Sequence, residues 1–565
     1  MSIDRRHASV ILLGWLILAL CGCEGVRVES CYENGAVASV SPIASEIGTQ
    51  VLAEGGNAVD AAVAVGFTLA VVYPQAGNLG GGGFAVVRDG QSGRIRALDF
   101  REKAPAAASE NMYLDSSGNV IEDLSTLGAL SSGVPGSVAG LHELWRAHGT
   151  MPWETLVVRA ARIADTGFLI NGPLAEDLEY RDEYLRLFET TAEIFVPQGR
   201  QLELGDRLVQ KDLARTIYSI AAEGPDVFYT GAVANLIDSC MVKHGGLVSR
   251  TDLEAYAPVW RVPIRFHFDS LDIYSMSPPS SGGIVLAQIL KILEPYDFSR
   301  YNPNHPEYIS LVVEASRLAF ADRSIHLGDP DFYDVPSTLL DPEYLASRRQ
   351  QILPGQAGSS DEIQPGHPPG RESEQTTHFS VCDAQGNMVA VTTTLNTRFG
   401  SCVVVEGAGF LLNNQMDDFS IRVGHPNTWG LIGGEANKIE PSKRMLSSMT
   451  PTLVLKNGEP FLITGSPGGS KIITTVAKSI IDFTRFRRNL NDVVSCPRFH
   501  HQWLPDTLYL EEDGFDLTVR RTLESYGYSV KERSLYGDLQ MIFIDPGGLV
   551  HAASDPRNGG APAGY

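Results

Sequence analysis

The segment Gln375-Thr376-Thr377-His378-Phe379-Ser380 lies at a border between two kinds of sequence. Residues 353 to 374 before it are rich in proline, glycine, serine and acidic residues and have no hydrophobic period, which predicts a loop. After it, β-forming residues alternate in two runs that end at Thr394-Leu395-Asn396, which predicts a pair of strands. Self-cleavage before a threonine at such a border would create a new N-terminus that carries a nucleophilic hydroxyl and its own amine base. The sequence therefore suggests a precursor that cuts itself between Gln375 and Thr376.

The turn between the two predicted strands indicates a partner for this threonine. Asp383-Ala384-Gln385-Gly386-Asn387 reads as a three-residue hairpin loop with glycine at the left-handed position. Such a loop pairs residues whose numbers add up to 770, so Thr376 would lie opposite Thr394, close enough for two hydroxyls to hydrogen-bond. A one-residue bulge would destroy this pairing, and threonine is also an ordinary strand residue.

A second candidate feature is Gly465-Ser466-Pro467-Gly468-Gly469-Ser470. It follows a predicted strand and opens a predicted helix, where two glycines would present bare amide donors at the positive end of the helix dipole. This arrangement suits an oxyanion hole. An ordinary strand-to-helix turn is an equally good interpretation of the sequence alone.

Three polar clusters have the chemistry to bind an α-amino acid head group. They are Asp99-Phe100-Arg101-Glu102, Asn413-Asn414-Gln415-Met416-Asp417-Asp418 and Leu446-Ser447-Ser448-Met449. Arginine would hold the carboxylate, aspartate the ammonium, and hydroxyls and amides the remaining bonds. His500-His501 is a weaker candidate for a metal site, because adjacent residues on a strand point to opposite faces, and we expect a structural role and no metal.

Length and composition exclude several classes of function. The chain has 565 residues, 43% hydrophobic and 20% charged, as in a well-packed soluble protein of one large unit or two to four domains. Its net charge of −22 argues against binding to nucleic acid or to anionic membranes. Five of the seven cysteines lie beyond the N-terminal region, widely scattered and without metal-ligand spacing, so neither a zinc site nor a disulfide framework is predicted.

The N-terminal region is typical of an export signal. Arg5-Arg6-His7 precede the apolar run Ala8 to Leu20, which is too short to span a bilayer. The run closes with Leu20-Cys21-Gly22-Cys23, which resembles a bacterial lipoprotein signal with Cys23 as the lipidated residue. Since Cys21 is unusual at its position, cleavage by an ordinary signal peptidase remains open. We therefore expect an exported protein of the periplasm or cell envelope, with a possible lipid anchor at the membrane surface.

Hydrophobic periodicity predicts helices and strands in separate clusters. Helices are predicted at 43–54, 58–72 with Asn57 as N-cap, 156–164, 213–222, 281–293, 308–321 and 471–482. Strands are predicted at 84–87, 376–383, 387–394, 409–412, 451–455, 461–464, 507–511, 527–532 and 539–544. Such clusters suggest an α+β fold with sheets packed face to face and helices outside.

In these motifs the chain resembles the γ-glutamyltranspeptidase (glutathione hydrolase) family, of the N-terminal nucleophile hydrolase class. The resemblance runs from about residue 35 to 565 and includes Glu54–Ala61, Gln75–Phe84, Thr376, Asn413–Phe419, Ser466–Gly469, Ser554–Arg557 and Ala563–Tyr565. It implies a four-layer αββα sandwich formed by two chains from one self-cleaved precursor. Residues 1–23 would be the signal, 24–375 the large subunit and 376–565 the small catalytic subunit, the two subunits staying together as a heterodimer.

The resemblance also implies roles for individual residues. Thr376 would be the nucleophile, Thr394 its hydroxyl partner, and Gly468 and Gly469 the oxyanion hole. The γ-glutamyl head group would be bound by Arg101, Asn396, Gln415, Asp418, Ser447 and Ser448. Residues 423–434 would form a lid, in which this chain has Trp429 where many bacterial members carry tyrosine, so that the hydrogen bond closing the lid would differ. The substrates would be glutathione or other γ-glutamyl compounds with water, amino acids or peptides as acceptors, and no cofactor is required.

Two alternatives remain. One is a relative within the same fold that acts on another acyl group, such as a cephalosporin side chain or a poly-γ-glutamate capsule; Arg101, Asp418 and the two serines argue against the first of these, because they suit a free α-amino acid end. The other is a non-catalytic binding lipoprotein, which the presence of Thr376 and both glycines disfavours.

Overall fold

The computed structural model describes residues 29–363 and 376–565. The expected signal with Cys23, and Gln375 on the far side of the expected cleavage point, lie outside these residues.

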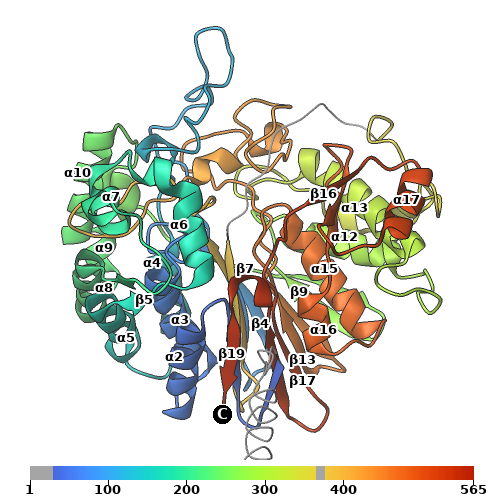
Figure 1. The fold of residues 1–565 in the computed structure, drawn as a ribbon, viewed down its shortest axis with the longest axis horizontal. Coiled ribbons are helices and arrows are strands. Elements are labelled where there is room, and N and C mark those ends of the chain that lie inside the picture. The colour runs from blue at the N-terminus through green and yellow to red at the C-terminus, as the bar shows by residue number, and fades with distance from the viewer. Residues whose placement is uncertain (1–28, 364–375) are drawn as a thin grey trace, which may run out of the picture.

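Two antiparallel seven-stranded sheets form the centre of the molecule (Figure 1). We call the one that carries Thr376 at a strand end the first sheet. Its strands are, in order, β19 (Ala561–Gly564), β2 (Ala36–Ser39), β10 (Thr377–Cys382), β11 (Met388–Thr394), β3 (Gly82–Arg88), β4 (Ile95–Phe100) and β7 (Val259–Arg261). The strands of the second sheet are β1 (Glu29–Tyr32), β18 (Val550–Ser554), β17 (Gln540–Ile544), β13 (Glu459–Thr464), β12 (Thr452–Lys456), β9 (Leu271–Ser275) and β8 (Ile264–Phe268).

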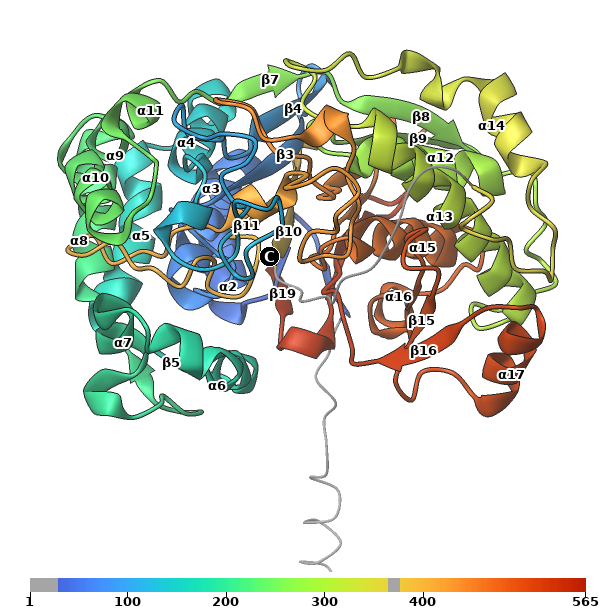
Figure 2. The same ribbon diagram turned by 90° about the horizontal axis from the view of Figure 1, so that it is seen from above.

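Helices lie on the outer side of each sheet (Figure 2). Beside the first sheet are α2 (Pro42–Ala53), α3 (Ala58–Val72), α4 (Ser137–His148), α5 (Trp153–Thr166), α6 (Gly172–Leu185), α7 (Glu189–Phe195), α8 (Lys211–Glu223), α9 (Asp226–Tyr229), α10 (Ala232–His244) and α11 (Arg250–Glu254). Beside the second sheet are α12 (Gly282–Leu293), α13 (Pro306–His326), α14 (Pro342–Arg349), α15 (Lys471–Thr484), α16 (Leu490–Ser495) and α17 (Leu517–Ser525). Two small sheets complete the fold, β5 (Phe168–Leu169) with β6 (Arg207–Leu208), and β14 (Phe499–His500), β15 (Leu508–Glu511) and β16 (Val530–Arg533).

The pleat of β10 and β11 sorts their side chains between two cores. Phe379 and Val391 lie on the face that packs against the helices α2 to α10. Met388 and Ala390 lie on the other face, in the core shared with the second sheet and α12, α13 and α15. Because alternate residues of a strand share a face, Thr376 and Thr394 belong to the face that looks toward the second sheet.

The predicted helices are all present, and one strand is not. Asn57 caps α3 as expected: its Oδ1 accepts from the amides of Val59 and Asp60, and the Asp60 carboxylate accepts from the Asn57 amide. The strand predicted at 409–412 is wrong, since these residues form only isolated bridges. Gly407 and Gly409 both have a positive φ, 77° and 76°, so the chain turns back sharply there instead of extending.

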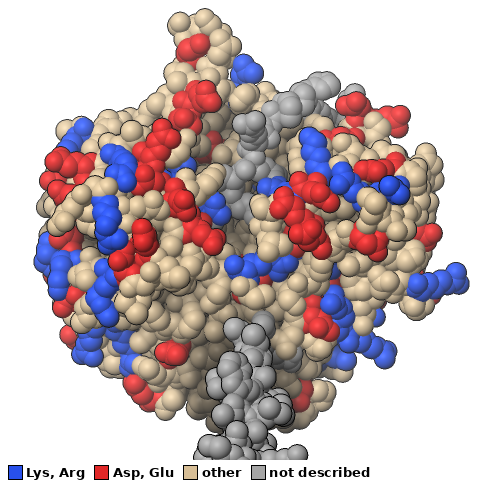
Figure 3. Space-filling view, in the orientation of Figure 1, with Lys and Arg blue, Asp and Glu red and all other residues tan. Residues whose placement is uncertain are grey.

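The surface carries both signs of charge interspersed on the face shown in Figure 3. On this face the acidic side chains are thus mixed with basic ones rather than gathered in one place. Within the described residues, no helix has both the length and the apolarity needed to cross a membrane.

Candidate active site

The hairpin of β10 and β11 brings the two threonines together. Its loop has Gly386 at a φ of 78°, and Thr377 pairs with Thr393, which is the register predicted from the loop length. Thr376 Oγ1 consequently lies 3.4 Å from Thr394 Oγ1, to which it donates. The amide of Asn396 donates to the same Thr394 oxygen over 2.9 Å. Thr376 is only 4% exposed, so its hydroxyl faces the interior of the molecule.

A buried histidine continues this polar face into the sheet interface. His378 Nδ1 lies 2.8 Å from Thr392 Oγ1, and its Nε2 lies 3.2 Å from Ser380 Oγ. Burial lowers the pKa of His378 to about 3, so the ring is neutral at physiological pH. Its ring fills the space beside Gly465, where an added Cβ would lie 2.2 Å from the imidazole.

The predicted glycine turn leaves two amides unused near Thr376. Gly468 and Gly469 have φ values of 131° and 56° and precede α15. Within the described residues, neither of their N–H groups donates a hydrogen bond. Gly469 lines the same cavity as Thr376, whereas Gly468 faces a neighbouring cavity that Asp177 and Arg398 also line. The turn therefore offers donors to a developing oxyanion at the border of the two cavities.

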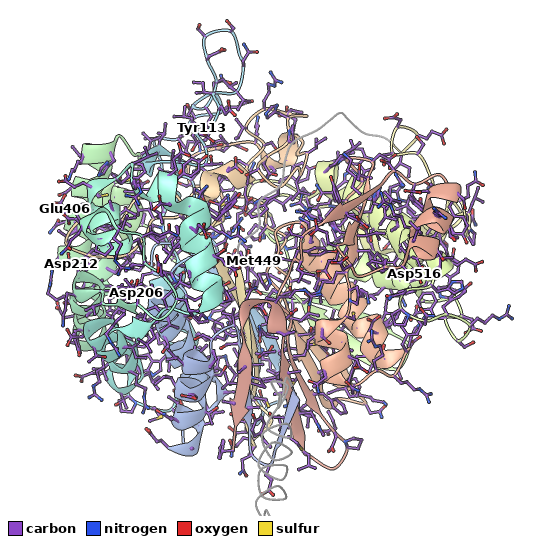
Figure 4. The ribbon with its side chains drawn as sticks, in the orientation of Figure 1. Tyr113, Asp206, Asp212, Glu406, Met449 and Asp516 are labelled. Carbon is purple, nitrogen blue, oxygen red and sulfur yellow. The ribbon has the colours of Figure 1, made fainter. Side chains whose placement is uncertain are left out.

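One cavity, with about 310 Å³ of empty space that includes open solvent, gathers the sequence-predicted site residues, with Gly468 next to its wall. Those that line it are Arg101, Thr376, Thr394, Asn396, Gln415, Asp418, Trp429, Ser447, Ser448 and Gly469. Met449 lines it as well, and Figure 4 labels this residue near the centre of the molecule, between the two groups of helices. The structure thus brings together the three polar clusters and the glycine turn around Thr376, while the roles of these residues stay predictions.

At the charged end of the cavity, one lining residue has an unused donor atom and another has an unused acceptor atom. Arg101 Nη2 pairs with Asp418 Oδ2, which also accepts from Gln415 Nε2 over 2.6 Å. Within the described part of the chain, Arg101 Nη1 and Gln415 Oε1 are buried without a hydrogen-bond partner. Because unpaired buried polar groups are unfavourable, this end of the cavity suits a ligand that carries both an anionic acceptor and a cationic donor.

Asp418 is the main ion-pair partner of Arg101, and Glu102 is a weaker one. Its Oε2 lies 3.6 Å from Arg101 Nη1, and the side chain is fully buried. Burial raises the pKa of Glu102 to about 7, in spite of the neighbouring guanidinium. A substantial part of the protein therefore carries a neutral Glu102 at neutral pH.

The backbone around the serine pair is held from the start of α12. Ser281 donates both its amide and its hydroxyl to the carbonyl of Ser447, over 2.8 and 2.6 Å. The Ser447 hydroxyl oxygen in turn accepts from the amide of Met449 over 3.1 Å. The segment that opens α12, whose sequence predicts only the start of a helix, thus supports this wall of the cavity.

Trp429 closes the cavity through a hydrogen bond of its own. Its indole Nε1 donates to Asn396 Oδ1 over 2.6 Å, and the residue is 4% exposed. An added Cβ on Gly469 would lie 2.4 Å from Trp429 Cε3, so the ring lies directly on the glycine turn. The indole N–H therefore links Trp429 to Asn396, another residue that lines the cavity.

One charged residue of the cavity, Arg323, was not predicted from the sequence. It lies in the last turn of α13, is 4% exposed and lines the cavity beside Ser448. The helix was predicted to end at Ala321, two residues earlier. An arginine directly after a long apolar helix, in Ala321-Asp322-Arg323, was the available signal.

The two adjacent histidines are both buried and hydrogen-bonded to other side chains of the fold. His500 Nδ1 lies 2.8 Å from Thr474 Oγ1, and His501 Nε2 lies 3.1 Å from Asp506 Oδ1. In the two described ranges no group of histidine, cysteine, aspartate and glutamate side chains is arranged to hold a metal ion.

Three features of this chain are typical of the class of N-terminal nucleophile hydrolases. They are a threonine at a strand end that faces a second threonine, a pair of unused glycine amides, and a mixed α/β fold built on two central sheets. The chain belongs to the γ-glutamyltranspeptidase family, whose sequence profile matches residues 44–565.

Similar proteins agree with this assignment. The chain is 48% identical over 528 residues to the glutathione hydrolase proenzyme of Escherichia coli K12, covering 93% of this chain and 91% of that protein. Its fold is similar to that of a cephalosporin acylase from Bacillus halodurans, with a TM-score of 0.86 and 26% identity over 96% of this chain and 98% of the acylase. It is also similar to a γ-glutamyltranspeptidase chain from Helicobacter pylori, with a TM-score of 0.57 and 42% identity over 61% of this chain and 97% of that one.

Proposed function

We propose that this protein transfers γ-glutamyl groups through an acyl-enzyme on Thr376, with glutathione and other γ-glutamyl amides as donors. The observation that carries the proposal is that Thr376 shares one cavity with the Arg101–Asp418 pair and its unused donor and acceptor atoms. A γ-glutamyl donor has a zwitterionic α-amino acid end and a reactive amide at the far end of a short side chain. The two ends of the cavity match these two parts.

In the proposed complex the α-carboxylate accepts from Arg101 Nη1 and from the hydroxyls of Ser447 and Ser448. The α-ammonium donates to Asp418, Gln415 Oε1 and Asn396. An arginine beside a carboxylate and an aspartate beside an ammonium form charge-assisted hydrogen bonds, which are stronger than neutral ones. Holding the head group in this way would place the γ-carbonyl at Thr376, between the serine wall and the glycine turn.

Acylation then follows from the position of the nucleophile. The Thr376 hydroxyl attacks the γ-carbonyl carbon while the α-amine of the same residue takes its proton. The carbonyl oxygen becomes an oxyanion that accepts from the unused amides of Gly468 and Gly469, where one donor is typically worth about 2.7–4 kcal/mol. When the C–N bond breaks, the leaving amine takes the proton, and a γ-glutamyl ester of Thr376 remains.

Deacylation repeats these steps with a second nucleophile. Water attacks the ester and yields glutamate, or the amine of an amino acid or peptide attacks and yields a new γ-glutamyl amide. In both cases the Thr376 amine takes the proton of the incoming group and returns it to the threonine oxygen. No step uses a cofactor.

Thr376 must first be freed from the chain before it. In the precursor its hydroxyl would attack the carbonyl of Gln375, forming an ester as the peptide nitrogen takes up a proton, and water would then release the new N-terminus. The products would be the large subunit, 24–375, and the small subunit, 376–565, which would stay together as two chains of one four-layer αββα sandwich. The extensive interdigitation of both parts in each sheet supports this: β2 and β3 of the first part flank β10 and β11 of the second.

Denaturing electrophoresis with N-terminal sequencing of the smaller band tests the proposal. We expect two bands, the smaller one beginning at Thr376, and release of the amine from a γ-glutamyl anilide. Thr376→Ala should remain a single chain and be inactive, and Thr376→Ser should retain cleavage. A single uncut band from an active sample, or a fragment that starts elsewhere, would refute the role of Thr376.

We also propose that the protein is exported to the periplasm or cell envelope, with Cys23 as the residue that carries a lipid. The support is the basic and apolar segment Arg5 to Leu20 and the Cys23 context. Mass spectrometry of the mature N-terminus in a membrane fraction tests this, and a mature chain that begins without Cys23 would contradict it.

A second candidate function is the removal of another acyl group, because an acylase has so similar a fold. Asp418 distinguishes the two. If a free ammonium is bound there, Asp418→Ala should abolish turnover of γ-glutamyl anilide. Asp331 is half-exposed and lies outside the cavity, so the control variant Asp331→Asn should leave turnover unchanged. Unchanged turnover in Asp418→Ala would favour the acylase alternative.

A further inference from the structure

Arg323 stands out among the buried arginines because it lies against the cavity without an anionic partner. The deeply buried Arg101, Arg317, Arg444 and Arg498 each pair with a carboxylate. Arg323 donates only to hydroxyls, from Nε to Ser281 Oγ over 2.9 Å and from Nη2 to Ser448 Oγ over 3.3 Å. No carboxylate among the described residues lies within ion-pair distance of it, and its burial is as complete as that of Thr376.

The unpaired guanidinium is still charged. Burial lowers the pKa of Arg323 to about 10, which leaves it protonated at neutral pH. Asp418, whose charge favours the protonated form, is already engaged by Arg101 and Gln415. A buried cation without a counter-ion is unfavourable, so its charge is available to an anion that enters the cavity.

The hydrogen bond to Ser448 indicates where this anion would lie. Because Ser448 Oγ accepts from Arg323 Nη2, its own proton is left to be donated elsewhere. Ser447 Oγ likewise accepts, from the Met449 amide. Both hydroxyls are thus set up as donors on the cavity wall, and a carboxylate, which only accepts, is the group they suit.

We propose that Arg323 is a positioning residue that selects donors with a free α-carboxylate, acting as a second cation behind Ser448. The inference rests on the proposed γ-glutamyl transfer and goes beyond it, since Arg101 alone is the cation that the sequence motifs indicate. Arg101 is largely neutralised by Asp418, so Arg323 supplies the charge that compensates the incoming carboxylate. It does so by holding the Ser448 hydroxyl with its proton toward the ligand.

Both cations of the cavity therefore come from the first part of the chain, and both serines from the second. Arg323 and Ser281 contact the serine pair from α13 and the start of α12. A cavity that recognises a carboxylate exists only when the two parts are assembled.

Two donors that differ only at the α-carbon test this selection. One is L-γ-glutamyl-p-nitroanilide, and the other carries a carboxamide in place of its α-carboxylate. We expect the wild type to prefer the carboxylate donor, and Arg323→Gln to lower kcat/KM for that donor by roughly 10- to 150-fold, chiefly through KM. The carboxamide donor should be much less affected, so the preference shrinks. Arg323→Lys, which keeps the charge, should retain part of the preference for the carboxylate donor.

The matched control is Arg88→Gln. Arg88 is also buried but donates to the carbonyl of Gly386, at the hairpin loop and outside the cavity. The Arg88→Gln variant should leave the preference for the carboxylate donor unchanged. Cleavage into two bands checks that each variant has folded; if Arg323→Gln does not cleave, Arg323→Lys is measured instead, with a several-fold smaller preference than the wild type expected.

Three results would overturn the inference: equal losses for both donors, an unchanged preference in Arg323→Gln, or, where only Arg323→Lys folds, an unchanged preference in that variant. A wild-type protein that releases p-nitroaniline from neither donor would instead refute the proposed γ-glutamyl transfer itself.

Discussion

The hydrogen bond between Trp429 and Asn396 gives the sharpest prediction for the closed cavity. Trp429→Phe keeps an aromatic ring over Gly469 but removes the indole N–H that donates to Asn396 Oδ1 over 2.6 Å. A buried acceptor that loses its donor costs about 1–3 kcal/mol. If residues 423–434 form the expected lid, this cost falls on its closed state, because Asn396 can bind water when the lid is open. At 1.36 kcal/mol for each factor of ten, we expect kcat/KM to fall about 5- to 150-fold.

Steady-state release of p-nitroaniline from γ-glutamyl-p-nitroanilide measures this change. Trp260→Phe is the matched control, since its indole donates over 2.7 Å to Glu143, away from the cavity. A double-mutant cycle with Asn396→Ala isolates the bond, because two residues that interact should give non-additive losses. If Trp429→Phe stays within twofold of the wild type, or if the cycle is additive, the lid is not held closed by this bond.

Three further predictions concern the surroundings of the cavity. Gly469→Ala would place a Cβ 2.4 Å from the Trp429 ring at a φ of 56°. Because this displaces the amide of residue 469, we expect kcat to fall by roughly 100-fold or more. Single-turnover kinetics measure this fall, and a wild-type rate would contradict it. Because the folded-state pKa of His378 is about 3, below about 6.5 when unfolded, the unfolded chain takes up the proton first. The free energy of unfolding should therefore be retained above pH 6.5 and fall as the pH approaches 3, by up to about 5 kcal/mol. Urea unfolding between pH 4 and 7 should show a flatter pH dependence in His378→Gln than in the wild type. An equal pH dependence in the two proteins would argue against a buried neutral ring. Asn57→Ala removes the cap of α3 and should cost about 1–2 kcal/mol of stability with activity at 25 °C unchanged; thermal unfolding checks this, and an unshifted midpoint would show that the cap contributes nothing.

Interactions between residues close in the sequence were enough to predict where the candidate nucleophile lies and which hydroxyl it faces. The length of the loop around Gly386 determines the register of β10 and β11, and the register determines that Thr376 faces Thr394. Asn57 predicted the first residue of α3 for the same kind of reason, since a cap acts on amides two and three residues away. Where local geometry departed from the extended state, as at Gly407 and Gly409, the prediction of a strand failed.

The family resemblance predicted which other residues belong to the site, although it did not indicate how they contact one another. It selected Trp429 as part of a lid but not the partner of its indole, and it passed over Arg323 altogether. Neither contact follows from a pattern, because a donor and its acceptor need only meet in space.

The sequence by itself thus determined the nucleophile and the strand register that positions it, since both depend on interactions between residues a few positions apart. Only the tertiary structure decided the charges of the cavity. Arg101 and Arg323 meet Asp418 and Ser448 across more than a hundred residues of chain, and their approach depends on how two sheets and the helices outside them pack. Burial then decides which of these charges has a partner and which is left for a ligand.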